Sequence, residues 1–220
     1  MYLEKEIMIA LRTGDIDKFL EKKPDNISIR EQALGKINLP TGNIVANDPV
    51  CNFQKDPFER TVAPGQYPVM LYIADIESDQ RVAFAEIRFT EELPADFELA
   101  TIAGDDVSRL GDDDFFGYGV DSGTGGFMDE IVCGELEKLH NQADDYIFKP
   151  LDDALEESYV PTYSVANILL PDNTQNVVAF SSGFGDGTYP SFWGFDKNGE
   201  LCSLITDFLV IDDDDDDDED

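Results

Sequence analysis

Three aspartates lie beside glycine-rich segments, where carboxylates are typical ligands of divalent cations. Asp121 precedes the run SGTGG, Asp129 follows shortly after it, and Asp186 lies inside GFGDG. Mg²⁺ and Ca²⁺ prefer carboxylate oxygens, and glycines allow the backbone to approach closely. One interpretation is that Asp121, Asp129 and Asp186 converge on Mg or Ca in a hydrolase. The alternative is a tight strand-to-helix connection, with Asp129 near the start of a helix.

The glycines at positions 183, 185 and 187 imitate a phosphate-binding loop. Such a loop needs a helix directly after it, because the free N–H groups at the helix start bind the phosphate. Here Pro190 follows, and the residues from Tyr189 to Asp196 alternate as in a strand. We therefore predict a glycine turn between strands, close to the 121–129 segment, and a hairpin turn at DKNGE.

Nucleophilic chemistry finds little support in the sequence. His140 is the sole histidine and lies seven residues after Cys133. Seven helical residues span about 10 Å, too far for a direct hydrogen bond between the two side chains. We expect His140 at the protein surface or at the boundary between surface and core. The three cysteines lack CxxC spacing, which argues against a zinc site or a disulfide framework, so no cofactor is predicted apart from the alternative Mg or Ca.

Tyr189 and Trp193 belong to a dense aromatic strand. Packing in the core is one interpretation of these rings. The other is the edge of a partner-binding groove, because Tyr and Trp favour positions with one dry and one wet side.

Hydrophobic periodicity indicates the elements that position these residues. The first 38 residues read as helical, and residues 65–76 and 81–89 as a hairpin whose first strand is central. The second strand becomes polar on one face at Glu86 and Arg88, which predicts a solvated end. A helix follows over about residues 128–143 and another turn of helix after Pro150, and from Tyr163 the chain is again β.

These elements predict an α+β fold: mainly antiparallel β-sheet of about eight strands, with N-terminal and central helices. The predicted organisation is an N-terminal helical segment (1–38), a single α+β domain (39–211) and a disordered acidic tail (212–220). A chain of 220 residues buries enough surface to need no disulfide or metal for folding.

Charge is the most unusual property of the chain. With 48 acidic and 15 basic residues, the formal net charge is −33, and nine of the acids lie in 212–220. Such a charge repels nucleic-acid phosphates and anionic membranes, so we expect neither as a partner; a basic protein is the natural complement. The N-terminus lacks the basic and apolar parts of a signal peptide, which predicts a cytoplasmic protein.

Several motifs together resemble the bacterial domain-of-unknown-function family 4241: LPTGNIVANDP, PGQYPV, IADIESDQRVAFAEIRF, GVDSGTGGFMD and VAFSSGFGDGTYPSFWGFDKNGELCSLITDF. The resemblance spans about Leu39 to Phe208. It implies a bacterial source and one domain over that span, and it carries no catalytic residue or cofactor. We therefore expect a non-enzymatic, acidic protein-binding domain, as an immunity or inhibitor protein is, with a metal-dependent hydrolase as the alternative.

Overall fold

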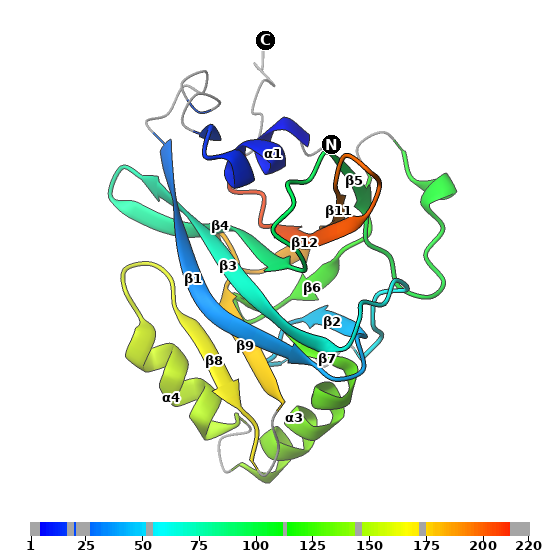
Figure 1. Ribbon diagram of the computed structural model, residues 1–220. Helices are drawn as coiled ribbons and strands as arrows, with labels where there is room; N and C mark the ends of the chain where they lie inside the picture. The colour runs from blue at the N-terminus through cyan, green and yellow to red at the C-terminus, as the bar shows by residue number, and fades with distance from the viewer. Residues whose placement is uncertain are drawn as a thin grey trace.

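The protein is built in four layers (Figure 1). The computed structural model describes residues 5–16, 20, 27–51, 55–111, 114–143, 147–171 and 175–211. Helix α1 (Lys5–Thr13) lies beside a six-stranded sheet, and helices α3 (Glu130–Gln142) and α4 (Lys149–Ser158) lie beside a four-stranded sheet. In the described part of the chain, no helix is long and apolar enough to cross a membrane.

The larger sheet has the strand order β1 (Ile27–Leu39), β3 (Gly65–Ile76), β4 (Asp79–Arg88), β12 (Leu201–Asp207), β11 (Ser191–Phe195) and β5 (Asp96–Leu99). The predicted hairpin is β3 and β4. Because β3 is apolar on both faces, it lies inside the sheet, between β1 and β4, as predicted.

The smaller sheet has the order β2 (Ile44–Asn47), β7 (Thr124–Asp129), β9 (Asn176–Ser181) and β8 (Val165–Leu169), and β6 (Tyr118–Val120) pairs separately with β10 (Gly187–Tyr189). A short 3₁₀ helix, η1 (Val107–Arg109), lies between β5 and β6. Every pairing between described strands is antiparallel. The α+β prediction is confirmed, although these strands number twelve; the acidic run 212–220 lies outside the described residues.

The N-terminal segment corrects one prediction. Residues 5–13 form α1 as expected, and the second predicted helix falls largely outside the described residues. Residues 27–39, however, form strand β1 rather than a helix. The helix formers between Glu31 and Leu34 suggested the wrong element, because pairing along almost the whole length of β3 outweighs local propensity.

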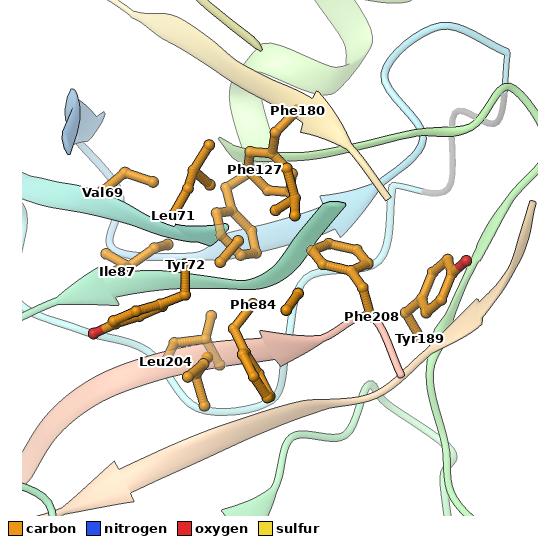
Figure 2. Packing of buried hydrophobic residues seen from close by; sticks show 14 of the residues in the cluster. Val69, Leu71, Tyr72, Phe84, Ile87, Phe127, Phe180, Tyr189, Leu204 and Phe208 are labelled. Atoms are coloured by element: carbon orange, nitrogen blue, oxygen red, sulfur yellow. The ribbon is translucent and has the colours of Figure 1, made fainter. Parts of the chain in front are cut away.

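The main hydrophobic core lies between the two sheets and beneath α1. Val69, Leu71 and Ile87 of the large sheet share it with Phe127 and Phe180 of the small sheet. Figure 2 shows these rings turned toward the strands of the hairpin, with Phe208 between Phe180 and Tyr189. A second, smaller core lies between the four-stranded sheet and the helices α3 and α4.

The outer edge of β1 is covered by two asparagine side chains of the small sheet. Asn167 donates to the carbonyl oxygens of Leu34 (2.8 Å) and Lys36 (3.2 Å). Asn176 donates to Lys36 O and accepts from the N–H of Asn38, each at 2.8 Å. The side-chain amides thus take the place of a neighbouring strand at this edge.

Candidate functional site

The glycine turn at residues 182–187 lies where the sequence predicts it, beside the 121–123 segment. Gly187 pairs with Val120 in the β6–β10 ribbon, and Ser182 N donates to Gly123 O at 3.0 Å. The turn itself is held by Gly185 N, which donates to Ser182 O at 2.7 Å. Tyr189 adds a hydroxyl bond to Gly185 O at 2.7 Å. The segment is therefore a fixed turn between strands and not a phosphate loop, as expected.

Phe184 projects from this turn into solvent, with 63% of its surface exposed. The guanidinium of Arg81 lies 5.1 Å from the centre of the Phe184 ring and donates to Gly183 O at 3.4 Å. Arg81 also forms an ion pair with Asp79 at 2.7 Å. An exposed aromatic ring backed by an arginine is a common feature of protein-binding surfaces.

Asp79 links this turn to the segment that connects α4 and β8. Its carboxylate accepts hydrogen bonds from Arg81 and from the Thr162 hydroxyl. The bond from Thr162, and then the bond and charge of Arg81, lower the pKa of Asp79 although partial burial opposes them. Asp79 therefore remains a carboxylate and joins two surface segments that are far apart in the sequence.

The three aspartates predicted as metal ligands do not come together. Asp121 and Asp186 are both exposed and lie next to the paired residues Val120 and Gly187. Asp129 lies at the far end of β7, and at about 3.4 Å per residue the strand from Thr124 to Asp129 spans roughly 17 Å. Across the described ranges, no three His, Cys, Asp or Glu side chains form a group able to hold a metal ion.

Asp129 has a structural task instead. It is fully buried and caps helix α3, accepting from Ile131 N at 3.2 Å and from Thr41 N at 3.0 Å. The Thr41 hydroxyl donates to it as well, at 2.9 Å. This is the strand-to-helix interpretation of the sequence. The helix begins after Asp129, so Met128, which fits the helical periodicity, belongs to strand β7.

A further buried carboxylate, Asp48, was not recognised from the sequence. It accepts backbone bonds from Val50, Cys51, Asp121 and Ser122 at 2.8–3.1 Å, and a hydroxyl bond from Ser122 at 2.8 Å. It joins the end of β2 to the 121–123 segment. Asp often accepts hydrogen bonds from the backbone N–H groups two and three positions later. The position of Asp48 before Val50 and Cys51 is therefore the one sequence signal that could have predicted this turn.

The three cysteines are protonated thiols at neutral pH. Partial desolvation, followed by the hydrogen bond and charge of Asp48, raises the pKa of Cys51 to about 11. Burial raises the pKa of Cys133 to about 12, and burial also raises that of Cys202. Since the thiolate is the nucleophilic form, none of them has the environment of a reactive cysteine.

His140 is buried, which corrects the predicted position at the surface or at the boundary of the core. Its ring nitrogens contact two backbone groups: Nδ1 accepts from Phe148 N at 2.7 Å, and Nε2 lies 3.0 Å from Pro49 O. A neutral ring with its proton on Nε2 satisfies both contacts. His140 therefore connects α3 to two other segments and is not exposed for catalysis.

Tyr189 and Trp193 are also buried, with 5% and 3% exposure. Trp193 packs against Phe58 and Phe89, and Tyr189 packs against Phe208. The core interpretation is correct for both rings, and the groove-edge interpretation is wrong because neither ring reaches the surface.

Glu86 and Arg88 belong to a buried network beneath α1 rather than to a solvated strand end. The Glu86 carboxylate accepts from Arg12 (2.7 Å), Arg88 (2.8 Å) and the Tyr72 hydroxyl (2.7 Å). Its side chain is 1% exposed and that of Arg12 is 6% exposed. Burial, and then the charge of Glu86, raise the pKa of Tyr72, so its hydroxyl keeps its proton and donates. We call Arg12, Tyr72, Glu86 and Arg88 the buried network.

Comparison with known proteins agrees with the motifs in the sequence. The family model described as Protein of unknown function (DUF4241) matches residues 37–206. The chain belongs to this family. The matched span begins near the end of β1 and ends within β12. It includes the four-stranded sheet, most of the six-stranded sheet, α3, α4 and the glycine turn, whereas most of β1 precedes it. No curated protein and no solved structure matches the chain.

Proposed function

We propose that this DUF4241 protein is a non-enzymatic binding protein of the cytoplasm, immunity-like or inhibitor-like, whose acidic surface captures a basic protein. The observation that carries the proposal is the way the charges are distributed. At least nine of the fifteen basic side chains are already ion-paired with carboxylates of the same chain. Acids outnumber bases by 33, so a large excess of carboxylates has no basic partner within the chain.

An excess of this size favours association with basic proteins. Complementary fields increase the rate of encounter and discourage partners of like charge, whereas close contacts determine how long a complex lasts. The negative charge of this chain therefore favours partner proteins whose surfaces are rich in Lys and Arg.

The buried side chains of Asp48, Asp129 and His140 support a structural rather than a catalytic role for these three residues. Asp48 and Asp129 accept several hydrogen bonds each, and both ring nitrogens of His140 contact backbone groups. A general acid or base must reach a substrate proton, and these three side chains are buried and already engaged.

Affinity capture tests the proposal. The tagged protein is purified from its native source at low salt, and the bound proteins are released with rising salt. We expect one or a few basic proteins, enriched over an unrelated acidic protein of similar net charge, and we expect their affinity to fall with salt. Recovery of the same basic proteins in equal amounts on the tagged protein and on the acidic control would contradict the proposal.

A further inference from the structure

Two segments that contact the start of β4, next to the turn of the β3–β4 hairpin, carry exposed apolar side chains. Phe184 is 63% exposed and Tyr159 is 61% exposed, and Val160 is 40% exposed. Pro161 follows them at the surface. We call Tyr159, Val160, Pro161 and Phe184 the tip surface.

Contacts of the two parts of the tip surface converge on the same carboxylate, that of Asp79. Phe184 lies over Arg81, and Arg81 pairs with Asp79. On the other side, Thr162, directly after Pro161, donates to Asp79 and to Gln80 O. Both apolar segments thus rest against residues 79–81, although they are about twenty positions apart in the sequence. In Figure 1 this is the region where the α4–β8 connection rises toward the β3–β4 hairpin.

The segments that carry these side chains are held in place before any partner arrives. A Cβ at Gly183 would lie 2.7 Å from Phe208 O, so the backbone of the turn is pressed against the core and has no room for a side chain. Val160 and Tyr163 exchange backbone bonds of 3.0 and 2.8 Å, and Ser181 N donates to Ser164 O at 3.0 Å. Exposed rings on fixed backbone lose little entropy on binding, which favours them as anchors.

The negative charge around the tip surface favours a basic partner over a second copy of this chain. Among the described residues, two arginines lie there, Arg30 and Arg81, and each is ion-paired. Seven carboxylates belong to the tip or to residues near it in sequence or strand pairing: Asp75, Glu77, Asp79, Asp121, Glu156, Glu157 and Asp186. A second copy of this chain would bring the same negative charge to the contact, so like charges oppose self-association here.

We infer that the tip surface is the docking site of the partner, and that its occupant is a basic protein segment with an apolar side chain between Lys or Arg residues. The apolar side chain covers Phe184 and Tyr159, and the basic residues face the surrounding carboxylates. This inference rests on the proposed function and adds the place of contact.

A displayed library of random peptides tests the inference with a defined probe. The full chain is used to select peptides at low salt, and the selection is repeated with Phe184→Ser combined with Tyr159→Ser. The matched control is Leu169→Ser, since Leu169 is 66% exposed and lies at the far end of β8. Melting curves confirm that all three proteins are folded.

The expected result is a set of peptides rich in Lys and Arg with an aromatic or aliphatic residue. These peptides should bind the tip variant at least about tenfold more weakly than the parent, and bind Leu169→Ser like the parent. Basic peptides that bind the tip variant as well as the parent would overturn the assignment of the tip surface as the docking site. The proposed function would still stand. Tip-dependent peptides without basic residues would overturn the assigned occupant. No enrichment at all would contradict both.

Discussion

The buried network and the tip surface are built from the same kinds of group: a carboxylate, an arginine and an aromatic ring. In the buried network, Glu86 is sealed beneath α1 and contacts Arg12, Arg88 and Tyr72. At the tip surface, Asp79 contacts Arg81, whose guanidinium supports the exposed Phe184. Sequence alone does not distinguish the two sets.

The two regions differ in their exposure to water, and this difference determines their roles. A sealed ion pair is costly to disturb, because removing one partner leaves a buried charge uncompensated. An exposed pair contributes little to stability, because water screens it. The buried network therefore holds α1 to the sheet, whereas the tip surface can change with little cost to the fold, as the proposed docking site requires.

The largest expected effect is on the buried network. Glu86→Gln removes the carboxylate that pairs with the buried Arg12 and one of the two carboxylates that pair with the partly buried Arg88. We expect a loss of roughly 3–5 kcal/mol in the free energy of unfolding. Urea denaturation measures it as a lower midpoint at an unchanged slope. The control is Glu31→Gln, since Glu31 also pairs with Arg88 but is 45% exposed. Equal losses in the two variants would show that burial does not separate the two regions.

We expect an intermediate effect for Asp79→Asn, which changes how the stability of the folded protein depends on pH. The folded pKa of Asp79 lies below its unfolded value of about 3.9, so its stabilisation is present above that pH and is lost as the pH falls through the lower folded value. Asp79→Asn should cost less than about 1 kcal/mol at neutral pH, and the difference from the parent should vanish in acid.

Melting temperatures of the parent and of Asp79→Asn, compared over falling pH, measure this difference. The general relief of repulsion on acidification is shared by both proteins and cancels in the comparison. Glu77→Gln, at the exposed turn of the same hairpin, is the control and should show no such trend. A gap that widens in acid would mean that the assigned direction is wrong.

The smallest expected effect on stability is that of Phe184→Ser. Because the ring is mostly exposed, we expect the free energy of unfolding to change by no more than about 0.5 kcal/mol. Urea denaturation beside the parent checks this. A loss above about 2 kcal/mol would show that Arg81 and Phe184 hold the turn together, and would make the tip surface a structural element.

The sequence predicted those parts of the fold that depend on local pattern. The alternation of residues 65–89 is strong enough to specify a hairpin, and Gly183 to Gly187 indicated a turn close to the 121–129 segment, where the structure places it beside residues 121–123. Strand β1 was missed because its middle contains helix formers, and strand pairing over a long distance determines its state.

The polar groups were harder to predict because their partners are distant in the sequence. Arg12 reaches Glu86 across 74 positions, and Pro49 reaches His140 across 91. A charged residue at the end of a strand normally indicates solvent, and a lone histidine on a helix normally indicates the surface. Both rules failed where a partner from another element covers the side chain and satisfies its hydrogen bonds.

The asparagines at the edge of β1 have a consequence for chemical ageing. Deamidation of Asn167 or Asn176 would replace a donor by a carboxylate oxygen directed at the carbonyls of Leu34 and Lys36. Two acceptors repel, so the strand edge would lose its cover and offer its free carbonyls to another chain. We therefore expect that keeping these two amide groups intact protects the edge of β1 from pairing with another chain.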